Sequence, residues 1–320
     1  MMYLRAPAWT SPWKRTALYV ALALGLFAGC RQTHDGASTA PRRQIGEPPE
    51  RRVEAGQDFR FRVRYFRSTD QGATWTLDPA IVAHNFTSLH ACYFEGTVWL
   101  SGLTFVTEIP ESESANPSPF VDVFRSRDGK TWTGDRIPLD FDVVGTIDPA
   151  CVAGPGGLEM WFAEMEGSSG DPAHGGRVSK IWRSHWNGKD AFHRGKIIVQ
   201  GEGLVDPAPF YTTDGRMRLF LNKDGQNIVE AVDGRLVSRW KNITVPDALD
   251  PGTGPLLLAF RPGEPRQVYH RAFDEERFYP IDSWNLDGVR SCESPTLTTM
   301  GDIWLLFCVE TGAGPVHGSE

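Results

Sequence analysis

An eight-residue segment that recurs along the chain constrains its fold more than any other feature. The segment runs from Ser68 to Trp75 and has the pattern S-x-D-x-G-x-T-W. A copy that is one residue shorter begins 58 residues later and spans 126–132, and a more divergent copy begins after another 58 residues and spans 184–190. Repetition at tens of residues, with strand-like patterning inside each unit, is typical of propellers and solenoids.

A second series of motifs follows in step with the first. Asp148, Asp206 and Asp250 each precede a proline and an apolar stretch, and Glu293 precedes Ser-Pro in a similar context. His90 lies 58 residues before Asp148 and so falls into the same series. Each unit then continues with a glycine-containing turn, an apolar strand, a third strand and a hairpin into a fourth. The short inner strands that we expect are 89–94, 150–153, 208–212, 254–257 and 296–299.

Four strands per unit correspond to a propeller blade, so we expect an all-β fold. Residues 58–320 are predicted to form a five-bladed β-propeller with four-stranded antiparallel blades. Strands from the N- and C-terminal ends of this domain would complete one blade together, which removes open sheet edges. Six blades are the alternative, if the terminal pieces form separate blades.

The repeated turn resembles the Asp-box, or BNR repeat, of sialidases and related β-propellers. The matching residues are Ser68, Asp70, Gly72 and Trp75 in the first copy, and Ser126, Asp128, Gly129 and Trp132 in the second. Asp and Gly favour a tight turn, the Ser and Asp side chains bind local backbone, and the Trp packs between blades. The resemblance implies a structural role, because Asp-boxes lie at the periphery of the blade.

The N-terminal residues predict export from the cytoplasm. Basic residues precede an apolar run at 17–27, and Ala28-Gly29-Cys30 follows it. A short apolar run with basic flanks is typical of a signal peptide rather than of a membrane span.

The segment from Leu26 to Cys30 resembles a bacterial lipobox, with Phe27 where that motif usually has Leu. The resemblance implies that residues 1–29 are removed and that Cys30 is lipidated. Residues 30–57 are rich in Pro, Arg, Glu, Gly and Ser and are expected to form a flexible tether. We therefore expect a bacterial envelope protein that is lipid-anchored at the outer membrane or the periplasmic face, with secretion as the alternative.

Four cysteines remain beyond Cys30, and the predicted compartment is oxidising, so two disulfides are one expectation. Cys92 and Cys151 occupy nearly matching places in neighbouring repeats and are candidates to pair with each other. Four small buried thiols are the alternative for Cys92, Cys151, Cys292 and Cys308.

Composition narrows the class of ligand. The net charge of −7 argues against a nucleic-acid partner. The 11 Trp residues suit carbohydrate binding, because flat aromatic rings stack on sugars. The sequence contains no C-x-x-C and no H-E-x-x-H motif, so we predict no metal site and no cofactor.

The innermost strands of a propeller line its central channel, so a polar residue at the same place in every inner strand would point at one spot. The candidate residues are His90, Asp148, Asp206, Asp250 and Glu293. Carboxylates that share one cavity repel each other, which should raise the pKa of at least one of them. Separation of an acid from a base in this way is what glycosidic bond cleavage requires.

The pattern D-P-x6-D-G-x3-L-F-L that begins at Asp206 resembles the five-bladed glycoside hydrolases of families 43, 32 and 68, as does the segment that begins at Glu293-Ser-Pro. The resemblance implies that Asp206 is the base or nucleophile, that Asp250 tunes the acid or stabilises the transition state, and that Glu293 is the general acid. A set of Asp148, Asp206 and Glu293 is the rival assignment.

We therefore expect a cell-surface or periplasmic carbohydrate-active propeller of glycoside hydrolase type. His90, Trp161 and Arg183 are the candidate substrate-binding residues. The protein is expected to be a monomer that binds an oligo- or polysaccharide and contacts the membrane only through its lipid anchor. A non-catalytic carbohydrate-binding or scaffold propeller is the first alternative, and a sialidase-like exo-glycosidase is the second.

Overall fold

A computed structural model describes most of the chain beyond its N-terminal part. The described residues are 61–104, 120–143, 145–165, 178–212, 214–250, 255–261, 268–272, 279–280, 288–289 and 291–311. The predicted signal peptide, the lipidation site Cys30 and the predicted tether lie outside these ranges. Within them, no helix has the length and apolar character that a membrane crossing would need.

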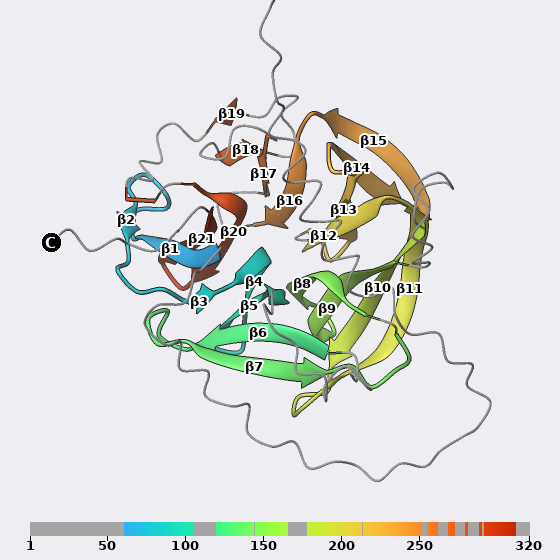
Figure 1. The fold of residues 1–320 in the computed structure, drawn as a ribbon, viewed down its shortest axis with the longest axis horizontal. Coiled ribbons are helices and arrows are strands. Elements are labelled where there is room, and N and C mark those ends of the chain that lie inside the picture. The colour runs from blue at the N-terminus through green and yellow to red at the C-terminus, as the bar shows by residue number, and fades with distance from the viewer. Residues whose placement is uncertain are drawn as a thin grey trace, which may run out of the picture. The chain divides into compact units, whose positions relative to one another are not determined.

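The described residues form an all-β propeller whose blades are four-stranded antiparallel sheets. Each of four sheets is a meander in which consecutive strands pair (Figure 1). Sheet B contains β4 (Phe86–Phe94), β5 (Thr97–Thr104), β6 (Phe120–Ser126) and β7 (Thr133–Pro138). Sheet C contains β8 (Ile147–Gly154), β9 (Gly157–Met165), β10 (Val178–Trp186) and β11 (Phe192–Glu202). Sheet D contains β12 (Leu204–Tyr211), β13 (Met217–Lys223), β14 (Asn227–Val232) and β15 (Arg235–Lys241). Sheet E contains β16 (Thr244–Leu249), β17 (Leu256–Phe260), β18 (Val268–Ala272) and β19 (Tyr279–Pro280).

A further sheet, sheet A, joins the two ends of the described chain. Its strands are β1 (Phe61–Ser68), β2 (Thr76–Leu77), β3 (Ala83–His84), β20 (Glu293–Met300) and β21 (Ile303–Thr311). The order is β2-β1-β21-β20, and β3 also pairs with β1. The pairing of β1 with β21 is continuous from Phe61 opposite Thr311 to Ser68 opposite Trp304. An N-terminal strand therefore enters a sheet that the C-terminal hairpin has begun, as the sequence analysis expected.

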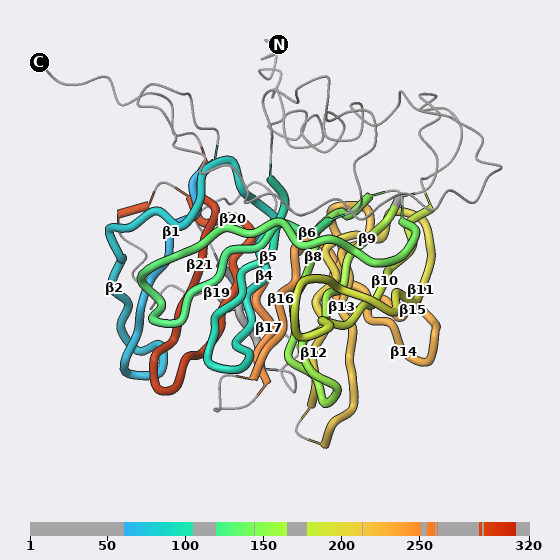
Figure 2. Tube along the Cα trace, turned by 90° about the horizontal axis from the view of Figure 1, so that it is seen from below, coloured from blue at the N-terminus to red at the C-terminus, as the bar shows by residue number. Residues whose placement is uncertain are grey.

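The first strands of sheets B to E and the strand β20 of sheet A lie innermost. Neighbouring members of this set contact each other in the order β20, β4, β8, β12, β16 and back to β20. In the side view of Figure 2, β20, β4 and β16 lie together in the middle of the molecule.

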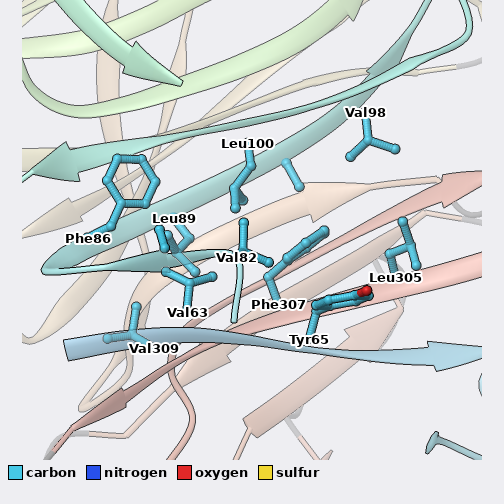
Figure 3. Close-up of a cluster of buried hydrophobic side chains, with 12 residues drawn as sticks. Val63, Tyr65, Val82, Phe86, Leu89, Val98, Leu100, Leu305, Phe307 and Val309 are labelled. Carbon is cyan, nitrogen blue, oxygen red and sulfur yellow. The ribbon is translucent and has the colours of Figure 1, made fainter. Parts of the chain in front are cut away.

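The apolar core is divided into clusters that lie between neighbouring sheets. One cluster is shared by each of the pairs A and B, B and C, C and D, D and E, and E and A. Figure 3 shows the first, in which Val63 and Tyr65 of β1 and Phe307 of β21 meet Phe86 and Leu100 of sheet B. Both faces of a sheet are thus buried, because side chains alternate between the faces of a strand.

This two-sided burial explains the continuous apolar run in β21. Leu305 and Phe307 face sheet B, whereas Leu306 and Cys308 belong to the cluster shared with sheet E. All four side chains are fully buried. A strand that is covered on both faces reads as an unbroken apolar run rather than as an alternation.

The innermost strands share a backbone irregularity near their start, which we call the bulge position. At this position one residue has a φ between 45° and 52°, and the pairing with the second strand shifts there. The residues are Ser88, Asp148, Asp206, Val245 and Ser294. A positive φ is uncommon outside glycine and is a genuine outlier for a β-branched residue such as Val. Because even Val245 adopts it, the bulge is imposed by the architecture and not by one local sequence.

The bulge position corrects the alignment of the repeats. It is followed by Pro149, Pro207, Pro246 and Pro295 in four strands and by Leu89 in β4. The counterpart of Asp148 and Asp206 in sheet E is therefore Val245. Asp250 follows the last residue of β16 and lies at the other end of that strand.

The prediction of an inner strand at 254–257 is wrong, because it rested on the same misalignment of the repeat that contains Asp250. The apolar run from Leu256 to Phe260 is the second strand of sheet E, and the segment Thr244–Leu249 is the inner one. Apolar patterning favoured the wrong strand because the inner strand of this sheet carries the acidic residue Asp247 on the inside of the protein.

The repeated turns form the local hydrogen bonds that their sequence predicts. In the first, Ser68 Oγ accepts from the Gly72 N–H at 2.8 Å, and Asp70 Oδ1 accepts from the Thr74 N–H at 2.8 Å. Hydrogen bonds from Thr74 lower the pKa of the exposed Asp70 carboxyl to about 2. Trp75 packs against the cluster between sheets A and E.

The other two turns use the same chemistry. Asp128 Oδ1 accepts from the Lys130 and Thr131 N–H groups, both at 2.8 Å. Trp132 contacts the rings of Tyr65 and Phe307 in sheet A and so packs between two sheets. In the divergent third turn Asn187 replaces Asp, and its Oδ1 accepts from three backbone N–H groups, those of Lys189, Asp190 and Ala191.

The cysteines divide into one disulfide and two thiols. Cys292 and Cys308 are bonded, and this links the start of β20 to β21 within sheet A. Cys92 and Cys151 are free and buried. The expected pairing of Cys92 with Cys151 is therefore wrong, although their side chains are hydrogen-bonded neighbours between sheets B and C.

A thiol count checks this arrangement. The chain from residue 31 onward, unfolded without reductant and alkylated, should carry two alkyl groups by intact mass, on Cys92 and Cys151. Prior reduction should raise the number to four, since the disulfide then opens. Four groups without reduction would contradict the disulfide, and none would show that the two thiols also pair.

A glycine pair separates packing from backbone strain in the first turn. A Cβ at Gly72, whose φ is +85°, would meet Trp304 at 3.1 Å, whereas one at Gly96, with a φ of +75°, would meet nothing within 4 Å. Both Gly→Ala changes carry the left-handed backbone cost of about 1–2 kcal/mol. Urea unfolding should show a greater loss of stability for Gly72→Ala, because Trp304 must also move. Equal losses would mean that Trp304 yields without cost.

Candidate active site

Asp148 and Asp206 occupy the bulge position of two neighbouring inner strands, β8 and β12, and their carboxyl groups are in contact. The Asp206 N–H donates to Asp148 Oδ2 at 3.4 Å, and the two side chains are also hydrogen-bonded to each other. Both residues remain partly exposed. The fold therefore brings two residues of the predicted polar series into contact.

The pKa values of the two carboxyls are coupled and both are raised. Burial raises the pKa of both groups, and repulsion by the Asp148 charge raises the pKa of Asp206 further. Two carboxyls in contact do not both ionise readily, so they titrate in two separate steps. Between these steps the pair carries a single negative charge.

Neighbouring hydrogen-bond donors place that charge on Asp148. The Ser88 hydroxyl, the Asp206 N–H and the Asp206 carboxyl all donate to Asp148, which stabilises its ionised form. Asp206 then keeps the proton, and its Oδ2 accepts from the Asn222 side-chain N–H at 2.7 Å. A carboxylate and a carboxylic acid thus lie side by side at the start of the inner strands.

Glu293 is the first residue of its own inner strand, β20, and lies one residue before the bulge residue Ser294. Its Oε1 accepts from the Thr311 hydroxyl at 3.0 Å, and Thr311 Oγ1 lies 2.9 Å from Ser291 Oγ. Burial raises the pKa of Glu293, and the Thr311 hydrogen bond opposes this in part. Glu293 is partly exposed and is a further carboxyl whose pKa is raised.

A closed polar layer lies two residues further along the inner strands. His90 Nε2 lies 2.8 Å from Asp247 Oδ1, although β20 separates β4 from β16 in the ring. Asp247 Oδ2 accepts from the Leu297 N–H at 2.9 Å, and Thr296 Oγ1 accepts from the Ala91 N–H at 2.8 Å.

This layer closes the centre of the ring below the bulge position. His90, Asp247 and Thr296 are exposed by 5%, 2% and 0% respectively. Although burial lowers it, the carboxylate of Asp247 raises the pKa of His90 to about 10, so the pair is ionic. Along the inner strands, Asp148, Asp206 and Glu293 therefore precede the level of the buried ion pair.

The expected polar series divides between different levels of the inner strands. Asp148 and Asp206 are at the bulge position, Glu293 is one residue before it, and His90 is two residues after it. Asp250 lies at the opposite end of β16. Of this series, the structure brings Asp148 and Asp206 into contact with each other.

Trp161 and Arg183, two of the candidate substrate-binding residues, lie elsewhere in sheet C. The Arg183 Nε donates to Glu159 Oε2 at 3.0 Å, and the Trp161 Nε1 donates to the same oxygen at 3.0 Å. The Tyr211 hydroxyl from β12 also binds Glu159, at 2.9 Å. Glu159 pairs with Val152 near the end of β8, away from Asp148 at its start. Trp161 is fully buried and presents no open ring face to a ligand.

Sequence reasoning missed three residues of the central polar layers: Asn222, Asp247 and Ser88. Asp247 carried a signal, because Val-Pro-Asp at 245–247 repeats the X-Pro element of the other inner strands. Asn222 and Ser88 carried none, since each lies in a run that reads as ordinary strand.

A metal site is not apparent in the part of the chain that the structure describes. No group of three or more His, Cys, Asp or Glu side chains there is arranged to hold an ion.

Comparisons with known proteins support the fold. No protein-family model matches the sequence, and neither does any curated protein. A protein of unknown function from Dyadobacter fermentans aligns over 78% of this chain and 84% of its own, at 15% identity and a TM-score of 0.50. A mutant of the glycoside hydrolase family 43 protein BlXynB from Bacillus licheniformis aligns over 72% of this chain at 11% identity and a TM-score of 0.50. This chain covers 50% of that protein. At such identities the likeness concerns the propeller fold.

The buried ion pair predicts how stability depends on pH. The folded protein holds the His90 proton more tightly than the unfolded chain, whose ordinary pKa is 6.5. The stability that this pair contributes is therefore complete below about pH 6.5 and is lost as the pH rises through about 10. Asp247→Asn should lower the free energy of unfolding by about 3 kcal/mol at pH 6 and should flatten the pH dependence above it.

Urea unfolding at several pH values between 6 and 9.5 measures this effect. Glu95→Gln, which removes an exposed carboxylate in the turn after β4, is the control and should leave the curve unchanged. An Asp247→Asn protein with the same pH dependence as the parent would exclude an ionised His90.

Proposed function

We propose that this protein is a carbohydrate-active β-propeller that hydrolyses glycosidic bonds with carboxyl groups at the start of its inner strands. The observation that carries the proposal is the contact between Asp148 and Asp206. It supplies a carboxylate beside a neutral carboxylic acid, with Glu293 one residue before the bulge position of another inner strand. Glycoside hydrolysis typically requires one carboxyl group that donates a proton and one that is ionised.

The hydrogen bonds support a distinct role for each carboxyl. Asp148, which accepts from Ser88 and from Asp206, is ionised and acts as the base or nucleophile. Asp206 remains protonated, stabilises the charge on Asp148 and keeps it in place. Glu293, whose pKa is raised by burial, donates its proton to the oxygen of the leaving group. Water then supplies the hydroxyl that the sugar gains, and the proton of this water returns to the carboxyl pair or to Glu293.

Two likenesses agree with this reaction class. The D-P and E-S-P segments resemble those of family 43, 32 and 68 glycoside hydrolases, and one of the structural neighbours is described as a family 43 protein. A shared fold does not by itself indicate an activity, because one fold hosts many activities. The contact between the carboxyl groups is therefore the main support for hydrolysis.

A carbohydrate-binding propeller without catalysis is the second candidate. Two observations favour it: the backbone N–H of Asp206 binds Asp148, and the layer of His90 and Asp247 closes the centre of the ring. Carboxyls that are tied in this way can accept hydrogen bonds from sugar hydroxyls without a bond being broken. The sialidase-like alternative stays a prediction. Arg183 and Trp161, the other two candidate substrate-binding residues, take no part in the proposed site.

The proposal includes the finer architecture and the location. We propose five blades, with sheet A as the blade that both ends of the domain complete, and Asp-box turns at 68–75 and 126–132. We further propose a monomer that is tethered to the bacterial envelope through a lipidated Cys30. Incorporation of a labelled fatty acid that Cys30→Ala abolishes would support the anchor.

Glu293→Gln is the direct test of hydrolysis. The parent chain from residue 31 onward should release reducing ends from at least one glycan in a panel of plant, microbial and host polysaccharides. Glu293→Gln should reduce this rate by about 10²–10⁴-fold, because the amide cannot supply the proton.

Glu310→Gln is a matched control, since it changes a buried glutamate of β21 that points to the other face of sheet A. It should retain most of the parent's rate. If sugar binds but no glycan is cleaved by the parent, the binding propeller is the better description. If Glu293→Gln is as active as the parent, Glu293 is not the acid.

A further inference from the structure

Asn222 carries a buried polar side chain that contacts the carboxyl pair and that the reaction above does not use. Asn222 lies on β13, the second strand of sheet D, and is only 4% exposed. Its Nδ2 donates to Asp206 Oδ2 at 2.7 Å. Asn222 is therefore one strand further out than Asp206 and reaches inward to it.

This contact fixes which oxygen of Asp206 can carry the proton. The carbonyl oxygen of a carboxylic acid accepts hydrogen bonds more strongly than its hydroxyl oxygen, so the Asn222 donor favours Asp206 Oδ2 as the carbonyl oxygen. The proton of the carboxylic acid then belongs on Oδ1, from which it can be donated to Asp148. Without the amide donor, either oxygen of Asp206 could be protonated and the side chain could turn.

A second observation indicates that this arrangement has a cost. The Asn222 Oδ1 is buried without a hydrogen-bond partner in the described structure. An unsatisfied buried acceptor costs about 1–3 kcal/mol, and such groups in native structures often serve a site. An apolar side chain of the same size would fill the space between the strands of sheet D without this penalty.

We propose that Asn222 is a positioning residue, which orients the Asp206 carboxylic acid toward Asp148. The inference rests on the proposed function, because it assigns Asn222 a task in that same site. It does not require Asn222 to touch the substrate.

The electrostatic effect has a definite sign. The Asn222 hydrogen bond favours ionised Asp206 and so lowers its pKa, against the burial and the Asp148 charge that raise it. Loss of the donor should therefore raise the pKa of Asp206 further, and the pair should keep its shared proton to a higher pH. A role in packing alone would change stability without moving this titration.

The test is a titration of the aspartate carboxyls that needs no substrate. The chain from residue 31 onward, labelled with ¹³C at the aspartate carboxyl carbon, is followed by NMR between pH 3 and pH 10. The Asp206 signal is assigned by its loss in Asp206→Asn. Asn222→Leu, which keeps the size of the side chain, should move the Asp206 midpoint upward by about one pH unit, the equivalent of one charge-assisted hydrogen bond.

Two further variants control for misfolding and for general effects. Asn227→Leu changes a half-buried asparagine in the neighbouring strand β14, outside the carboxyl pair, and should leave the midpoint unchanged. Asn222→Asp keeps the shape but replaces the donor by a further acid, so the Asp206 midpoint should rise at least as far as in Asn222→Leu. This second variant carries the test if the leucine protein does not fold.

The outcomes separate this inference from the proposed function. An Asp206 midpoint that does not move in Asn222→Leu and Asn222→Asp overturns the role of Asn222, even if the parent hydrolyses glycans. A midpoint that rises in both variants supports it, even if no glycan is cleaved and the hydrolase proposal fails.

Discussion

The antiparallel pairing of β1 with β21 is the constraint on which the rest of the architecture depends. It joins residues from opposite ends of the domain along the whole length of β1, so that sheet A exists only when both ends are present. The Cys292–Cys308 disulfide reinforces the C-terminal half of the same sheet. Once sheet A is complete, every sheet has a neighbour on both faces, and each apolar cluster is shared by two sheets.

Closure of the ring also explains the chemistry at its centre. Inner strands that converge bring backbone and side chains from distant repeats together, and the polar groups among them need partners once they leave water. The polar groups find partners in two different ways at successive levels of the inner strands. His90 and Asp247 form a fully buried ion pair, whereas Asp148 and Asp206 form a pair of carboxyls with raised pKa values in residues that remain partly exposed. Only the second arrangement leaves carboxyl chemistry available to a ligand.

Backbone geometry makes the second arrangement available. The bulge recurs in all of the innermost strands, yet only two of its residues carry an acid, while the others are Ser88, Val245 and Ser294. Residues in such conformations persist because the surrounding structure determines them, and they are common where side chains are aimed at a function. The fold thus sets the backbone conformation at each bulge, and the sequence decides which side chain is placed there.

Local sequence determined the parts of this protein whose structure depends on near neighbours. The turns at 68–75 and 126–132, the strands of most blades and the acids before Pro149 and Pro207 could all be predicted, because turn hydrogen bonds and strand burial are encoded within a few residues. The tertiary structure alone decided the rest. It made Val245, rather than Asp250, the counterpart of Asp206 in sheet E. It left Cys92 and Cys151 as free thiols, and it brought Asn222 and Asp247 to the centre. Those outcomes depend on how strands from distant repeats align across the ring, and no local pattern specifies that alignment.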